Sequence, residues 1–293
     1  MTRANRKQLL IFLIVPIIIL FIITAYPFFF GIYHSFHNWL LYKPQLGTPF
    51  VGFKQYITIF SNPEFWMALV RSLIYLGLSV SISIALGFGQ ALVLSGDEIK
   101  GKSVIRSLLI IPLVISPVVV GFAFRFMYNT DLGVLPWLLD QIGIHFSRIL
   151  GDPRWSLFAV ILVDIWNQTP LAFLVLLAGI QSINPELYEV AAIDGSSYLQ
   201  SLRYITTPLL KRAFLVVLII RSIDAFKAFD IVYVMTEGGP GRSTEIMSLF
   251  GYRLAFVGWR MGTASAFAMI LFYIVVGISL FFIKQFQGDG NND

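Results

Sequence analysis

Six long apolar stretches dominate the sequence and limit what it can fold into. They lie near residues 9–30, 70–94, 104–127, 156–180, 208–234 and 264–284. A bilayer core about 30 Å thick needs roughly 20 apolar residues per helix, so each stretch is predicted to be one transmembrane helix. The composition agrees, because 57% of the 293 residues are hydrophobic and only 13% are charged. We therefore expect an all-α membrane protein with six transmembrane helices.

The loops between these segments are too short for a soluble domain, so residues 1–293 are expected to form one transmembrane domain. The first segment follows Arg3, Arg6 and Lys7 and lacks a small-residue cleavage site, which favours a retained helix over a signal peptide. Six spans place both termini on one side. Lysine and arginine crowd the shorter loops on that side, which predicts cytoplasmic termini. The net charge of +5 suits an anionic lipid surface and gives no reason to expect nucleic acid.

A short polar segment, residues 184–207, separates the fourth and fifth apolar stretches and is predicted to form an elbow of two short helices. Asn184 can cap the first helix, and Pro185 suits its first position because a missing N–H is harmless there. Gly195 suits the left-handed residue that ends this helix. The sequence therefore predicts about three helical turns that stop at Gly195.

The second helix of the elbow is predicted to begin at Ser197, because Ser197 and Gln200 have the spacing of a capping box, and to run towards Pro208. Small residues in the first helix allow another backbone to come close, and its acids offer charges to a partner. These residues are Glu186, Glu189, Ala191, Ala192, Asp194 and Gly195. An ordinary interfacial helix between two spans is the alternative interpretation.

Polar and charged residues gather in the fourth and fifth predicted spans. A charged side chain at the bilayer centre costs about 2.5–3.5 kcal/mol on insertion scales, so such a group normally faces protein or a water-filled path. The two spans are predicted to line a shared path, with aromatic rings that could stack on a sugar. The predicted path residues are Asp164, Trp166, Asn167, Gln168, Arg221, Asp224, Phe226, Lys227, Phe229 and Asp230.

The charges of the fifth span also allow a purely structural interpretation. Arg221, Asp224, Lys227 and Asp230 follow one another at intervals of three, so they could form a self-neutralised ladder along one helix face. In the fourth span, Pro170 is expected to kink the helix and free a backbone carbonyl to line the path.

Three patterns match known sites without the surroundings that those sites need. Residues 96–103 match the phosphate-binding loop Gly-x-x-x-x-Gly-Lys-Ser, but both neighbours are predicted spans rather than a strand and a helix. Asn167 begins a glycosylation pattern inside a span. His34 and His37 lack a third metal ligand nearby. The chain has no cysteine, which excludes thiolate sites, and no catalytic arrangement stands out, so we expect neither a metal nor an enzyme.

Residues 189–195 followed by 205–208 resemble the Glu-Ala-Ala…Gly…Ile-x-x-Pro loop of permease subunits from binding-protein-dependent ABC importers. Val190 stands where the family usually has alanine, which could alter how closely a partner packs. The resemblance spans nearly the whole chain. It includes residues 50–53, 65–66 and 106–112.

The stretch after the fifth predicted span resembles the carbohydrate-uptake branch of this family, particularly the first permease subunit of maltose and glycerol-3-phosphate type systems. It contains Gly238, Gly239 and Pro240. The resemblance implies a loop at these residues near an extracytoplasmic solute-binding protein. A plain turn would explain them as well.

The resemblance implies a type I ABC importer permease that takes up a sugar, polyol or sugar derivative across a bacterial or archaeal cytoplasmic membrane. Its partners would be a second, homologous permease subunit and a dimer of ATPase subunits that bind ATP and Mg²⁺. The elbow would be the coupling helix that docks on the ATPase, through Glu189, Asp194 and the turn at Gly195. A secondary transporter driven by an ion gradient is the main alternative, and a membrane scaffold without transport is a third.

Overall fold

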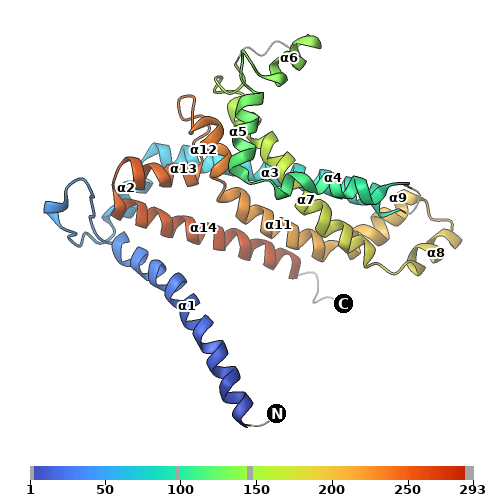
Figure 1. The fold of residues 1–293 in the computed structure, drawn as a ribbon, viewed down its shortest axis with the longest axis horizontal. Helices are drawn as coiled ribbons and strands as arrows, with labels where there is room; N and C mark the ends of the chain where they lie inside the picture. Colours follow the sequence, from blue (N-terminus) through green and yellow to red (C-terminus); the bar gives the residue numbers. More distant parts are fainter. Residues whose placement is uncertain (1–2, 97–98, 144–147, 288–293) are drawn as a thin grey trace. The chain divides into compact units, whose positions relative to one another are not determined.

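The computed structural model describes residues 3–96, 99–143 and 148–287. These residues form helices joined by loops, with one isolated β-bridge between His37 and Phe50 (Figure 1). They divide into two compact units, Met1–Trp66 with Phe250–Ile274 and Met67–Leu249 with Val275–Asp293. The expected all-α class is confirmed for the described part of the chain.

The first unit joins the N-terminal helix and the loop after it to part of the C-terminal helix. Gln55 is buried there, and its side-chain amide donates to the carbonyl of His37 at 3.3 Å and accepts from the hydroxyl of Thr263 at 2.7 Å. The unit contains α1 (Arg3–Ser35), η1 (Pro44–Leu46), α2 (Lys54–Phe60), η3 (Arg253–Val257), and parts of α13 (Met247–Tyr252) and α14 (Met261–Gln287).

The second unit is built around α7, which packs against α4, α5, α11 and α12. Most of α7 is buried: Val160, Phe173 and Leu176 on it are completely enclosed, whereas Phe158, Leu162 and Trp166 form an exposed stripe. The helices of this unit are most of α3 (Pro63–Ser95), α4 (Lys102–Val114), α5 (Pro117–Met127), α6 (Val134–Gln141), α7 (Ser156–Gln181), α8 (Glu186–Ile193), α9 (Tyr198–Ser201), η2 (Leu202–Thr206), α10 (Thr207–Leu209), α11 (Lys211–Phe226) and α12 (Asp230–Thr236).

The described residues contain four helices that are long and apolar enough to cross a membrane, or five if the bent pair α4–α5 counts as one span. The four are Pro16–Ser35, Pro63–Ser95, Ser156–Gln181 and Met261–Gln285. The multi-pass architecture is thus supported, whereas the count of six spans stays a prediction.

The predicted span 104–127 is not one continuous helix. It consists of α4 and α5, which are bent by 94°. The break falls at Ile115 and Ser116, both extended, directly before Pro117. The cause is local, because proline disfavours a helical conformation in the residue before it. By contrast, α7 continues as one helix through Pro170, and the kink expected there stays a prediction.

The predicted span 208–234 is also divided. Its main helix, α11, has 16 residues and ends at Phe226, and α12 starts at Asp230. At about 1.5 Å per residue, a helix of this length covers roughly 24 Å, less than a bilayer core. Lys227 and Asp230 therefore lie at a break between two helices and not inside one span.

Helices α3 and α7 lie in close contact at Gly87. A β-carbon at Gly87 would lie 2.7 Å from the β-carbon of Ala172 and 2.7 Å from the backbone nitrogen of Phe173. Gly87→Ala is therefore expected to overpack this contact and destabilise the unit by about 1–3 kcal/mol. The midpoint of thermal unfolding in detergent should fall by several degrees.

Gly89→Ala is the matched control, because this glycine lies one half-turn further along α3 and its β-carbon would meet nothing within 4 Å. Its unfolding midpoint should stay the same or rise slightly, since alanine favours helix over glycine. Equal midpoints for the two variants would contradict the close approach.

Candidate functional site

A buried ion pair joins two helices inside the second unit. Asp164 on α7 is 5% exposed and Arg221 on α11 is 1% exposed. Nη2 of Arg221 donates to Oδ2 of Asp164 at 2.7 Å and to Oγ of Ser79 on α3 at 2.8 Å. The Ser79 hydroxyl in turn donates to the same carboxylate oxygen. Because a buried charge is costly without a partner, this cluster ties α3, α7 and α11 together.

A pocket of about 310 Å³ lies beside the pair. The exposed side chains of Asp224, Lys227 and Asp230 line it, from the end of α11 and the start of α12. Tyr75 and Arg221 are 0% and 1% exposed, so their polar atoms are buried behind the wall. The pocket therefore presents two carboxylates and an ammonium group to any ligand.

Seven of the ten predicted path residues line this pocket. They are Asp164, Gln168, Arg221, Asp224, Lys227, Phe229 and Asp230. The other three lie outside it. The ring of Trp166 packs beside that of Phe124 at 5.2 Å between centroids, Phe226 is completely buried, and Asn167 is 1% exposed. The structural geometry thus gathers most of the predicted set, while their role in transport stays a prediction.

Asn167 supports the break between α4 and α5. Its side-chain amide donates to the carbonyl of Pro112 at 2.6 Å and accepts from the side chain of Gln168 at 2.9 Å. The carbonyl of Pro112 would pair with the amide of Ser116 in a continuous helix, but Ser116 is extended. Asn167 therefore satisfies a backbone group that the break leaves open.

The self-neutralised ladder is wrong as an account of the fifth span. Arg221 pairs with Asp164 of another helix rather than with Asp224. In the described part of the chain, no ion pair joins Asp224, Lys227 and Asp230 to one another. The ladder fails because α11 ends at Phe226, so the helical spacing on which it depends stops before Lys227.

Tyr75 and Ser79 were missed by the sequence analysis. The polar residues Ser72, Tyr75, Ser79 and Ser83 recur at intervals of three and four along α3, and all are at most 1% exposed. This spacing puts them on one helix face. A polar stripe on an apolar helix was therefore the available signal.

The elbow has the predicted caps. Oδ1 of Asn184 accepts from the amide of Glu186 at 3.1 Å at the start of α8. Gly195 has φ +77°, and the amides of Gly195 and Ser196 donate to the carbonyls of Ala192 and Ala191, as in a Schellman motif. These contacts end α8 after 8 residues.

The second part of the elbow begins with the predicted capping box. The amide of Ser197 donates to Oε1 of Gln200 at 2.7 Å, and the Ser197 hydroxyl accepts from the amide of Gln200 at 3.4 Å. The helix continues through the π-helical η2 to α10, which contains Pro208, so it reaches the residue towards which it was predicted to run. Tyr188 on α8 and Thr206 share a hydrogen bond of 2.9 Å between their hydroxyls.

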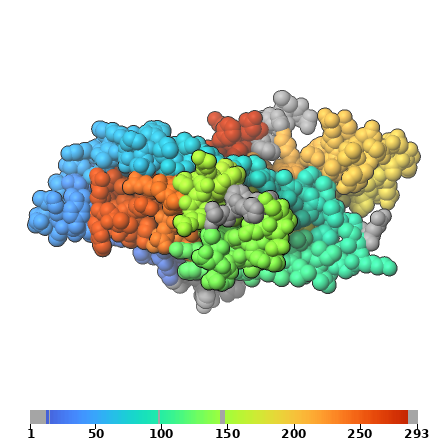
Figure 2. Space-filling model, turned by 90° about the horizontal axis from the view of Figure 1, so that it is seen from above, coloured from blue at the N-terminus to red at the C-terminus, as the bar shows by residue number. Residues whose placement is uncertain are grey.

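The elbow exposes both apolar and acidic side chains. Figure 2 shows this segment, in yellow, on the surface. Val190, Ile193 and Leu199 are 57%, 85% and 72% exposed. Glu189 and Asp194 are exposed and form no ion pair among the described residues. Exposed apolar groups with acids between them are typical of a surface that contacts another protein.

The phosphate-loop pattern at residues 96–103 lies partly outside the described residues, because residues 97 and 98 are not described. The described residues on either side belong to α3 and α4. Two helices rather than a strand and a helix flank the pattern, in agreement with its rejection as a nucleotide site.

The predicted outer loop follows α12 and forms a tight turn. Gly238 has φ +88°, and the peptide bond between Gly239 and Pro240 is cis. The hydroxyl of Thr244 donates to the carbonyl of Gly239 at 3.0 Å and shares a hydrogen bond of 2.7 Å with Thr236. These bonds hold the turn on the end of α12.

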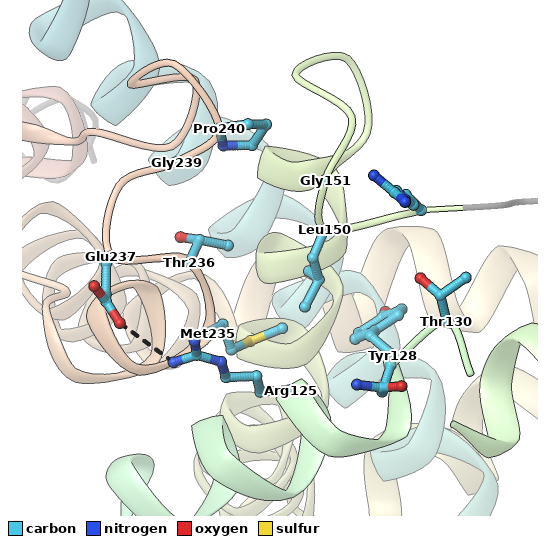
Figure 3. Close-up of a pocket in the computed structure, with 12 residues that line it drawn as sticks. Arg125, Tyr128, Thr130, Leu150, Gly151, Met235, Thr236, Glu237, Gly239 and Pro240 are labelled. Carbon is cyan, nitrogen blue, oxygen red and sulfur yellow. Dashed lines mark hydrogen bonds and ion pairs between the residues drawn. The ribbon is translucent and has the colours of Figure 1, made fainter. Parts of the chain in front are cut away.

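A second pocket, of about 450 Å³, lies between this turn and the end of α5 (Figure 3). Nη1 of Arg125 lies 3.4 Å from Oε1 of Glu237 at this pocket. The same nitrogen donates to the carbonyl of Val234 at 2.9 Å. Tyr128, Leu150 and Pro240 lie around the same space.

Long apolar helices around a buried ion pair and a charged pocket are typical of a multi-pass membrane protein. Residues 9–289 match the family described as binding-protein-dependent transport system inner membrane component. The chain belongs to this family. It is thus a permease subunit of ABC transporters, a class of subunit that is not itself an enzyme.

Relatives and solved structures agree with this assignment. The chain is 35% identical over 282 residues to the trehalose/maltose transport system permease protein MalF of Thermococcus litoralis, covering 96% of this chain and 94% of the relative. It is 32% identical over 286 residues to the trehalose transport system permease protein SugA of Mycobacterium tuberculosis, covering 97% and 91%. A chain from a crystal structure of a bacterial ABC transporter involved in the import of the acidic polysaccharide alginate superposes with a TM-score of 0.83, at 26% identity over 97% of this chain and 96% of that chain. The type I ABC permease fold is therefore established.

Proposed function

We propose that this chain is the membrane subunit through which an ATP-driven importer takes up a sugar, polyol or sugar derivative. The pocket beside Asp164 and Arg221 is the observation that carries the proposal. Carboxylates accept hydrogen bonds from hydroxyl groups, Lys227 and Gln168 donate them, and the ring of Phe229 offers an apolar face. Relatives named for trehalose and maltose support this class of cargo.

The partners of the complex would be a second permease subunit, an ATPase dimer and an extracytoplasmic binding protein. The last is supported by a structural relative, the bacterial alginate ABC transporter solved with an alginate pentasaccharide-bound periplasmic protein, at 27% identity and a TM-score of 0.81. ATP and Mg²⁺ would bind to the ATPase subunits and not to this chain. Six spans, with both termini in the cytoplasm of a bacterium or archaeon, complete the proposal.

The elbow would dock on the ATPase and transmit its closure to the helices. Its exposed residues Val190 and Ile193 would bury apolar area against the partner, and Glu189 and Asp194 would supply polar contacts. Closure of the ATPase dimer would then move the attached helices as rigid bodies and switch access to the pocket. The turn at residues 238–240 would lie near the binding protein at the opposite face.

Reconstitution of the complete importer into liposomes tests this function. With trehalose and maltose as test solutes, uptake is expected to require ATP, to stop with vanadate, and to persist after proton and sodium gradients are collapsed. Uptake that needs an ion gradient and ignores vanadate would support the secondary transporter instead. A deletion strain without any uptake defect would support the scaffold.

A further inference from the structure

We propose that the pocket beside Asp164 and Arg221 selects its cargo by charge, admitting neutral or cationic saccharides and rejecting anionic ones. This inference rests on the proposed sugar import and adds the charge class of the solute. It depends on which of the charges around the pocket are already paired, and on which groups of its wall remain free to contact a ligand.

The charges of the pocket do not cancel. Asp164 and Arg221 neutralise each other at 2.7 Å, so they contribute no net charge. Asp224 and Asp230 carry two negative charges and Lys227 carries one positive charge, which leaves a net charge of −1 (−2 + 1) on the exposed wall. Since these three groups form no ion pair among the described residues, their charges face the pocket.

The remaining wall contributes no charge to balance this excess. Its other lining residues are Tyr75, Pro117, Gln168, Ala228, Phe229 and Ile231. A charged pocket with low-dielectric walls concentrates ions of opposite sign and excludes ions of the same sign. A carboxylate, sulfate or phosphate on a sugar would therefore be repelled, while hydroxyl groups could donate to the free carboxylates.

The exposed groups of the wall can pair with a saccharide. Each sugar hydroxyl can donate a hydrogen bond to the carboxylate of Asp224 or Asp230 and accept one from Lys227. Tyr75 and Arg221 are 0% and 1% exposed, so they form the closed back of the pocket. Arg221 does not make the pocket favour anions, since Asp164 already balances its charge.

The absence of cysteine from the sequence makes the charge of the pocket measurable. In the complete importer, Ala228→Cys gives this chain a single thiol, which lies on the pocket wall. This thiol is reacted with two methanethiosulfonates, the cationic 2-(trimethylammonium)ethyl reagent and the anionic 2-sulfonatoethyl reagent. Each reaction rate is divided by the rate of the same reagent with a small free thiol. We expect the normalised rate with the cationic reagent to be roughly ten times the normalised rate with the anionic reagent. Gln168→Cys is a second reporter in case Ala228→Cys does not assemble.

Charge variants test which residues cause the preference for the cationic reagent. Asp224→Asn with Asp230→Asn should abolish or reverse the preference, and Lys227→Gln should increase it. Asp131→Asn removes one negative charge from an exposed loop outside the pocket and should change nothing. Three results would overturn the proposal. The first is equal normalised rates for the two reagents, and the second is an unchanged rate ratio in the Asp224 and Asp230 double variant. The third is no reaction at either cysteine.

The cargo itself gives an independent check. ATP hydrolysis by the complete importer with its binding protein should be stimulated by some neutral or amino saccharide, tested with trehalose, maltose and glucosamine, and not by glucuronate. Stimulation by glucuronate alone would overturn charge selection and leave sugar import intact. Thiol reactivity does not depend on ATP coupling, so it still reports on the pocket if the proposed function fails.

Discussion

Arg221→Leu is expected to destabilise the second unit by about 3–5 kcal/mol, because it leaves the carboxylate of Asp164 buried without its partner. Asp164 is 5% exposed, so water cannot replace the lost guanidinium. For a unit of about 200 residues, each kcal/mol shifts the unfolding midpoint by about 2–4 °C. A fall of about 10 °C in detergent should therefore be seen by thermal unfolding followed by size-exclusion chromatography.

A double variant separates the lost charge balance from lost packing. Arg221→Leu combined with Asp164→Asn removes both charges and should recover much of the lost stability, as apolar replacements of buried ion pairs often do. Asp224→Asn is the matched control, because Asp224 lies on the same helix, is exposed and has no ion pair among the described residues. An Arg221→Leu midpoint equal to that of this control would contradict the structural role of the pair.

Glu189→Gln combined with Gly195→Val is expected to abolish solute uptake and solute-stimulated ATP hydrolysis while the protein still inserts and assembles. Gly195 has φ +77°, a conformation that a β-branched residue strongly disfavours, so valine should displace the turn that ends α8. Glu189 is exposed and offers its carboxylate to a partner. ATP hydrolysis by reconstituted complexes, with and without solute and binding protein, measures the coupling.

Gly143→Val controls for backbone strain. Gly143 has φ +79° with nothing within 4 Å of its β-carbon, but it lies in the loop after α6, which is expected on the other side of the membrane. This variant should keep its coupling. Gly195→Asn should also retain it, because asparagine tolerates the left-handed conformation. Unchanged coupling in the Glu189 and Gly195 double variant would remove the basis for the docking role of the elbow.

Features that depend on neighbouring residues could be predicted from the sequence. The caps at Asn184, Gly195 and Ser197 each involve residues only a few positions apart, so their hydrogen bonds follow from local spacing. The all-α class follows from the length of the apolar segments. The break before Pro117 was equally local and could have been predicted from that proline.

The partners of the charged residues could not be predicted in the same way. Arg221 and Asp164 are 57 positions apart, and Arg221 and Ser79 are 142 positions apart. Helical spacing left a ladder along one helix open beside a path shared by two spans, because spacing contains no information on which helices are neighbours. The same limit explains why Trp166 and Asn167 were grouped with the pocket although their side chains lie outside it.

The sequence by itself determined that this chain is a helical membrane protein with caps at Asn184, Gly195 and Ser197, because burial of apolar segments and capping bonds act over short distances along the chain. Only the tertiary structure decided which charges neutralise each other and which remain free in the pocket. The physical reason is that ion pairing depends on separation in space, and packing of α3, α7 and α11 sets that separation.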